Sequence, residues 1–123
     1  MHAPLTQEDL DQHTHVSNAY SHHMFDDILY SEGANMLVTK ANAYWLIDQI
    51  IMAQLEYHMQ PYYLAYQTWT LESNEDNRGA LSCVVAGEEV YRKRYDTYTF
   101  PLDKVVLIHE NDVVMLPSEH PLA

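Results

Sequence analysis

The stretch that decides the fold is ANMLVTKANAYWLIDQIIMAQLEYH, residues 34–58, which is mostly apolar and contains neither Gly nor Pro. Its apolar residues recur at helical spacing, at Leu37, Val38, Ala41, Trp45 and Met52. Ser31 or Glu32 can cap the start, and Pro61 follows the end. We therefore predict one long helix from Ala34 to about His58.

Beyond Pro61 the pattern changes from helical to alternating. Gln67, Trp69 and Leu71 alternate with Tyr66, Thr68 and Thr70, which is typical of a strand with one buried face. Further strands are predicted at Ala80–Val85, Val90–Tyr95, Val105–His109 and Val113–Leu116. The expected fold class is α+β, with the long helix packed on one face of a four- to five-stranded antiparallel sheet. A short N-terminal helix is expected from Thr6 to about Gln12, and His13–Tyr30 is expected to be irregular, with a helical turn around Met24–Leu29.

A chain of 123 residues with 47% apolar residues favours a single domain over residues 1–123, with flexible ends at 1–15 and 120–123. The lone Cys83 forms no internal disulfide, and the N-terminus lacks the pattern of a secretory signal, so we expect a cytoplasmic location. Asp48 and Gln49 interrupt the longest apolar run, which predicts no membrane span.

The charge of the chain is strongly negative. Eighteen acidic residues face six basic ones, for a net charge of −12. Eleven of the acids lie before Arg78, where Lys40 is the only base. Few cations are available to replace the counterions of a phosphate backbone, so direct nucleic-acid binding is not expected. The electrostatic field of this negative charge favours encounter with a basic protein. The alternative is that the charge only keeps the protein soluble.

Several short motifs occur together, namely Tyr30-Ser-Glu-Gly33, Ala43-Tyr-Trp-Leu-Ile-Asp48, Gln67-Thr-Trp-Thr-Leu71, Phe100-Pro-Leu-Asp103 and Leu116-Pro-Ser-Glu-His120. In that order they resemble a small bacterial domain-of-unknown-function family of about this length, found in chromosomes and mobile elements. The resemblance covers roughly residues 20–120 and implies one compact intracellular domain with no known catalytic residue. The chain departs from it at Thr99, where the family tends to have an acid, and in extra N-terminal histidines.

Asp48 is the single carboxylate of the apolar stretch. An ionised carboxylate in such a setting must be hydrogen-bonded, paired or protonated. Tyr hydroxyls, a backbone amide, Arg92 or Arg94 can supply the partner. We interpret Asp48 as a structural polar anchor rather than as a catalytic acid or an exposed interface residue.

Metal and nucleophile chemistry have weak support. The best candidate for a metal site is the group His13, His15, His22 and His23, which is followed by Asp26 and Asp27. These residues lack a recognised ligand spacing and a Cys partner, so we expect no resident metal and no cofactor. Cys83 is expected on the inward face of a strand, where a thiol is inert. The Arg92-Lys93-Arg94 cluster is expected to balance acids or to protect a sheet edge.

These patterns favour an acidic protein-interaction module over an enzyme. Its specific form is a nucleic-acid mimic that inhibits a basic nucleic-acid-binding or defence protein. The candidate partner-binding carboxylates are Asp26, Asp27, Glu32, Glu72, Glu75 and Asp76. Tyr62, Tyr63 and Tyr66, together with Tyr57, can mark a partner or homodimer patch. The alternative is a small-molecule- or metal-binding protein or enzyme with a cleft between helix and sheet, using Asp48, His58 or the N-terminal histidines.

Overall fold

A computed structural model describes residues 19–21, 28–73, 78–95 and 103–120 of the chain. Its helical elements are α2 (Glu32–Lys40), α3 (Tyr44–Ala53) and the 3₁₀ helices η1 (Tyr57–Tyr62) and η2 (Pro117–Glu119). Its strands are β1 (Ala19–Ser21), β2 (Leu29–Ser31), β3 (Gln67–Ser73), β4 (Gly79–Val85), β5 (Glu88–Tyr95), β6 (Lys104–Glu110) and β7 (Val113–Met115). The predicted N-terminal helix lies outside the described residues.

The strands form one mixed sheet of seven strands in the order β1-β2-β7-β6-β3-β4-β5. The five strands predicted after Pro61 are present as β3–β7, and their neighbours pair antiparallel. The prediction of a purely antiparallel sheet of four to five strands is wrong, because β1 and β2 extend it and β2 pairs parallel with β7. These two strands lie in the segment that was expected to be irregular. Each spans three residues, which is too short to produce an alternating pattern.

The prediction of one long helix is also wrong. The chain leaves the helix after Lys40 and re-enters one at Tyr44, so two short helices replace it. Asn42 adopts a φ of 52°, in the left-handed region. Its N–H donates to the Thr39 carbonyl, and the Ala43 N–H donates to the Val38 carbonyl at 2.8 Å. This is the Schellman pattern of a helix end, in which Asn is the usual substitute for Gly.

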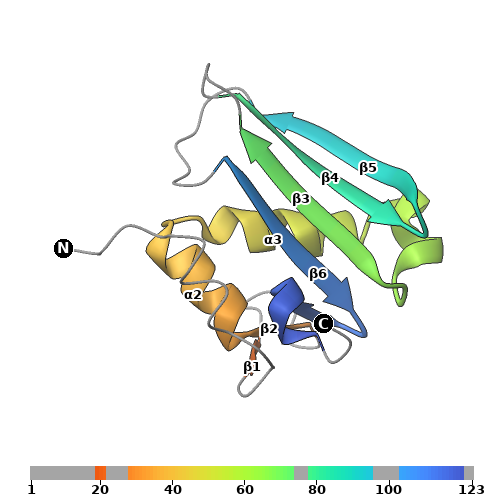
Figure 1. Ribbon diagram of the computed structural model, residues 1–123. Coiled ribbons are helices and arrows are strands. Elements are labelled where there is room, and N and C mark those ends of the chain that lie inside the picture. Colours follow the sequence, from red (N-terminus) through yellow and green to blue (C-terminus); the bar gives the residue numbers. More distant parts are fainter. Residues whose placement is uncertain (1–18, 22–27, 74–77, 96–102, 121–123) are drawn as a thin grey trace.

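The core lies between α3 and the inner face of the sheet. Apolar side chains of α3 that are 0–2% exposed, at Leu46, Ile47, Ile50, Ile51 and Ala53, belong to the same buried cluster as Trp69, Leu81 and Leu107 on the strands. Figure 1 shows α3 behind β3, β4 and β6, with the opposite face of these strands turned to the viewer. In the described part of the chain, no helix is long and apolar enough to cross a membrane.

Candidate binding surface

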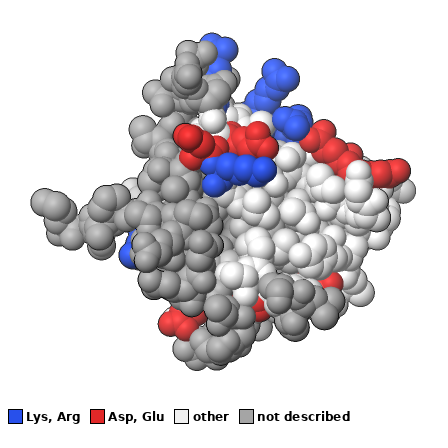
Figure 2. Space-filling view, in the orientation of Figure 1, with Lys and Arg blue, Asp and Glu red and all other residues white. Residues whose placement is uncertain are grey.

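The face of the sheet that points away from α3 carries small, uncharged side chains at its centre. Because side chains alternate along a strand, the residues between the core positions of β3, β4 and β6 share this face. They are Thr68, Thr70, Ala80, Ser82, Val84 and Val106, all only partly exposed, and the buried Ile108. We call this surface the open face. Figure 2 shows it as a broad uncharged area whose upper margin is charged.

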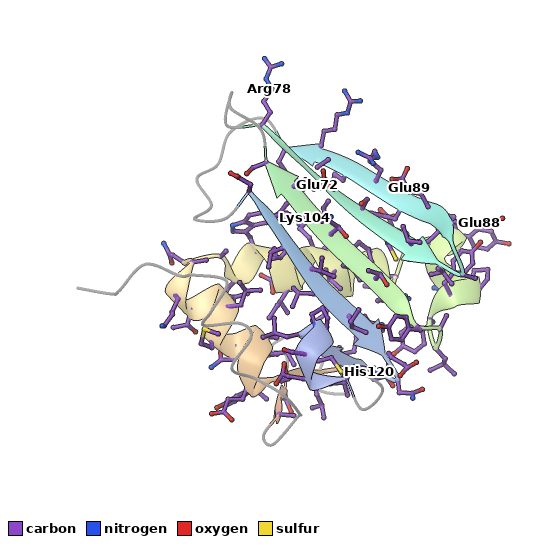
Figure 3. All side chains as sticks on the ribbon, in the orientation of Figure 1. Glu72, Arg78, Glu88, Glu89, Lys104 and His120 are labelled. Atoms are coloured by element: carbon purple, nitrogen blue, oxygen red, sulfur yellow. The ribbon has the colours of Figure 1, made fainter. Side chains whose placement is uncertain are left out.

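The charged margin is the end of the open face where β3 finishes and β4 and β6 begin. In the register of the strands, Lys104 lies opposite Glu72 and Arg94 lies opposite Ala80. A hollow of about 400 Å³ opens here, and its lining comprises Glu72, Ser73, Arg78, Gly79, Ala80, Arg92, Arg94 and Tyr95. Figure 3 shows Arg78, Glu72 and Lys104 together at this end of the sheet. We call it the arginine hollow.

The arginine hollow concentrates positive charge in a chain that has little of it. Three of the six basic residues of the chain line it, and Lys104 adjoins it through Glu72. Planar guanidinium groups match the geometry of a carboxylate, which they can hold by two parallel hydrogen bonds. Glu72, the only acid among the described residues of the lining, offsets part of this charge. The hollow is therefore suited to a single anionic side chain rather than to a long polyanion, which the net charge of −12 repels.

Arg92 is tied to its own strand by an ion pair. Its Nη2 donates to Glu89 Oε1 at 2.7 Å, and its Nε donates to the same oxygen at 3.0 Å. The hydrogen bond from Arg92 lowers the pKa of Glu89, and the bond to Glu89 raises the pKa of Arg92. Both side chains are about half exposed, so water screens the pair and its contribution to stability is small.

Of the predicted carboxylates, Glu32 and Glu72 lie in the described part of the chain. Glu32 is in the first turn of α2, and Glu72 lines the arginine hollow. The structure thus places these two on different elements. The other candidate acids and histidines lie outside the described residues, namely Asp26, Asp27, Glu75, Asp76, His13, His15, His22 and His23.

The predicted tyrosine patch is spread over different environments. Tyr57 is 93% exposed, whereas Tyr62 packs against the core cluster. The Tyr63 ring lies 6.3 Å from the ring of the buried His109. The Tyr66 ring lies edge-on to His120 at 4.9 Å. Three of the four rings therefore contact the margin of the core, although Tyr66 is 42% exposed, and Tyr57 projects fully.

Asp48 lies half-buried on α3, among residues that face the core. It is near the hydroxyl of Tyr30 on β2, whose pKa is raised by burial and further by Tyr44, Tyr20 and Asp48. The role of Asp48 as a structural anchor stays a prediction. Cys83 is fully buried, as expected, and burial raises the pKa of its thiol to about 12.

The most elaborate buried polar cluster surrounds Glu119, which sequence reasoning did not single out. Its carboxylate is 1% exposed and accepts from the Ser31 hydroxyl at 2.6 Å, the Leu116 N–H at 2.9 Å and the Gly33 N–H at 3.1 Å. Ser31 in turn caps α2 by accepting from the Ala34 N–H at 3.0 Å. The motifs at 30–33 and 116–120 thus meet in space, and their shared chemistry is structural.

Two further buried polar groups connect the strands to their surroundings. Gln67 and Gln54 exchange two hydrogen bonds of 2.8 Å, and Trp69 Nε1 donates to Gln67 Oε1 at 2.8 Å. His120 Nε2 and Glu110 Oε1 lie 2.9 Å apart and join η2 to β6. Among the described residues, no group of three His, Cys, Asp or Glu side chains is arranged to hold a metal ion.

Comparisons with known proteins give a family but no characterised relative. A search of curated proteins found no match, and neither did a search of solved structures. A family of unknown function, DUF6876, matches residues 4–120, which is nearly the whole chain. The chain therefore belongs to the family of unknown function DUF6876.

Proposed function

We propose that the protein is a protein-interaction module that binds its partner on the open face. The observation that carries this proposal is the contrast between the two faces of the sheet. The inner face is covered by α3 and α2 through fully buried side chains, while the open face presents partly exposed Thr, Ser, Ala and Val side chains with a charged end. A surface of this kind favours association with another protein, because removing its uncharged centre from water costs little free energy.

Two properties of the protein select the partner, one acting at long range and one at direct contact. At long range, the net charge of −12 speeds encounter with a basic protein and slows encounter with nucleic acid or another acidic surface. At contact, the arginine hollow favours a partner that presents one acidic side chain or a chain carboxylate. We therefore infer a partner that is basic overall and that places a carboxylate between Arg78, Arg92 and Arg94.

Inhibition by nucleic-acid mimicry is the narrower form of this proposal. It rests on the acidic composition and on the bacterial and mobile-element setting that the sequence resemblance implies. Glu72, one of its candidate phosphate substitutes, shares the arginine hollow with three guanidinium groups. The wider interaction role has the stronger support, because it uses the open face and needs no run of unpaired carboxylates.

A cleft-based small-molecule or metal activity is the alternative. The space between α3 and β3 that it would use is filled by fully buried side chains such as Ile47, Ile50 and Trp69. Packed side chains thus occupy this space, and the interaction role is the better supported of the two.

The test uses two matched variants. Thr70→Arg places a long cation at the centre of the open face, and Thr39→Arg places the same residue on an exposed position of α2. A photo-reactive amino acid at Ser82 captures whatever contacts the open face in the native cell, and mass spectrometry identifies it. We expect one protein to be captured by the wild type and by Thr39→Arg, and to be lost with Thr70→Arg. Equal capture by all three excludes the open face.

A further inference from the structure

Strand β5 forms the outer edge of the sheet. Among the described strands it pairs with β4 alone, and it is eight residues long with most of its side chains exposed. An edge strand presents a row of backbone N–H and C=O groups that can pair with a strand of another molecule. The side chains of β5 therefore decide what, if anything, adds to this edge.

The charges of β5 are ordered along the strand. Glu88 and Glu89 occupy its start, Val90 and Tyr91 its centre, and Arg92, Lys93 and Arg94 its end. Figure 3 shows Glu88 at the part of β5 near the turn that follows β4, and Glu89 farther along the strand, where it pairs with Arg92. Two such strands aligned antiparallel bring the acidic half of each against the basic half of the other.

A β-bulge in β5 places each acidic residue on the same face of the sheet as a basic residue three or five positions later. Tyr91 lies opposite Cys83 and Glu89 lies opposite Val84, so Val90 is an extra residue in the strand. As a result Glu89 and Arg92 both lie on the open face, although they are three positions apart. On the inner face, Glu88 lies opposite Val85 and Lys93 opposite Leu81. In an unbroken strand, residues three apart would point to opposite faces.

One register of two antiparallel β5 strands sets four of these five charges against opposite charges, and leaves Arg94 outside the paired positions. A two-fold axis at the bulge pairs Glu88 with Lys93 on the inner face and Glu89 with Arg92 on the open face, each pair occurring twice. If the axis moves onto Val90 or Tyr91, residues of the open face in one copy lie opposite residues of the inner face in the other. Moving it to Glu89 or to Arg92 sets two like charges directly against each other, which is destabilising. The bulge is thus a place on β5 where the axis meets uncharged side chains and both acids face basic residues.

Exposed apolar side chains and a largely polar hollow lie beside the edge in the same place. The ring of His58 in η1 stacks on Tyr91 at 6.1 Å, and next to it Tyr57 is 93% exposed. Leu55, which precedes η1, is 57% exposed. A hollow of about 490 Å³ adjoins them, lined by Glu56, His58, Glu89, Val90, Tyr91, Arg92 and Lys93. A second copy placed on the two-fold axis would bring its own η1 to this surface and cover it.

We propose that two copies of the chain associate through β5, antiparallel about a two-fold axis at Val90 and Tyr91, so that one sheet continues across both. The symmetric contact leaves the centre of the open face of each copy accessible. Arg92 also lines the arginine hollow, so the two proposals share this residue. Thr70→Arg, which changes β3 rather than β5, tells them apart. An acidic peptide could satisfy Arg92 and Lys93, but it would leave Glu88 and Glu89 facing like charge. The observed order of acids and bases favours a second copy of this chain.

Charge exchange tests the register directly. In Glu88→Lys/Glu89→Arg all four paired positions are basic, and in Arg92→Glu/Lys93→Glu all four are acidic. We expect the wild type to be a dimer by sedimentation and light scattering, and each double variant to dissociate at least about tenfold more readily. An equimolar mixture of the two double variants should form a heterodimer, because every pair then joins opposite charges. The quadruple variant, which carries all four changes, should dimerise as the wild type does.

Matched controls separate this contact from net charge and from folding. Glu32→Lys/Asp103→Lys and Lys40→Glu/Lys104→Glu change the net charge by the same amounts at residues outside the four paired positions, and should remain dimers. Far-ultraviolet circular dichroism checks that each variant folds, and Thr70→Arg should leave the dimer intact. A monomeric wild type, double variants that stay dimeric, or a mixture that does not associate would each overturn the proposal. A monomer that binds an acidic peptide at β5 would also overturn it.

Discussion

The carboxylate of Glu119 accepts a hydrogen bond from the hydroxyl of Ser31 at 2.6 Å, across a separation of 88 positions in the chain. Because Ser31 also caps α2, the start of that helix depends on a residue of η2. Substituting Glu119 by Ala removes the acceptor of three buried donors. We expect the free energy of unfolding to fall by about 2–4 kcal/mol in urea titrations, against little change for the exposed Glu56→Ala. A fall as small as that of Glu56→Ala would contradict the role assigned to Glu119.

Gly33→Ala should destabilise the protein although Ala is the better helix former. A Cβ at this position would lie 2.6 Å from Glu119 Cδ and 2.8 Å from Leu116 Cδ1. We expect this crowding to outweigh the propensity gain of about 1 kcal/mol. In the Glu119→Ala background most of the loss should disappear, and a double-mutant cycle measured by urea unfolding gives the coupling. Additive losses would show that Gly33 is needed for another reason.

Asn42 should tolerate Gly and reject β-branched residues. Its φ of 52° is in the left-handed region, which Gly enters freely and Val does not. We expect Asn42→Gly to leave the melting temperature unchanged or slightly higher, and Asn42→Val to cost about 1–2 kcal/mol. Ala41→Val, at an ordinary helical φ of −85°, is the control. An equal effect of the two Val substitutions would argue against a helix end at Asn42.

His109 should make stability depend on pH. Its ring is fully buried, and within the described part of the chain neither ring nitrogen has a hydrogen-bond partner. Burial lowers the pKa of His109 to about 4, against 6.5 for an ordinary histidine. Between these two values the unfolded chain binds the proton and the folded chain does not, so stability falls as the pH falls from 6.5 towards 4 and levels off below.

The expected loss from His109 is about 2 kcal/mol between pH 7 and pH 5. Other groups also titrate in this range, so the measurement compares urea unfolding of the wild type with that of His109→Leu at both pH values. The variant should lose about 2 kcal/mol less than the wild type over the same step. If the free energy of unfolding falls equally in the two proteins between pH 7 and pH 5, then the folded protein binds a proton at His109 as the unfolded chain does, which would contradict this prediction.

Cys83 should react only when the protein opens. Its side chain is fully buried opposite Trp69, and the pKa of its thiol is about 12, so thiolate is scarce at neutral pH. We expect labelling by an aromatic disulfide reagent to be far slower in buffer than in denaturant, with a rate that follows the fraction unfolded. Rapid labelling of the native protein would place Cys83 nearer to the surface.

Local sequence patterns predicted the strands better than the helices or the sheet. The alternation around Trp69 identified β3, because one face of that strand is buried and the other is not. Residues 34–58 predict one helix because their apolar residues recur at helical spacing on both sides of Asn42. The signal that was missed is Asn42, whose side chain permits the left-handed conformation that ends α2.

Contacts between distant segments could not be read from local patterns. The Leu29 N–H donates to the Asp112 carbonyl at 2.8 Å, and this link to the C-terminal hairpin is part of what makes β2 a strand. The arginine hollow depends in the same way on the register of four strands. Arg92 and Arg94 form a cluster in the sequence, but Arg78 joins them only when β4 pairs with β5, and Lys104 only when β6 and β3 pair with them in turn.

The Ser31–Glu119 link also constrains how the chain is made. During synthesis, β2 and α2 leave the ribosome long before Glu119 does, and until then the Gly33 and Leu116 amides have no such acceptor. Pairing of β2 with β7 waits for the same late segment. The contacts of β2 and α2 with η2 and β7 can form only after these late segments have emerged, so this part of the fold depends on long-range contacts, which form slowly.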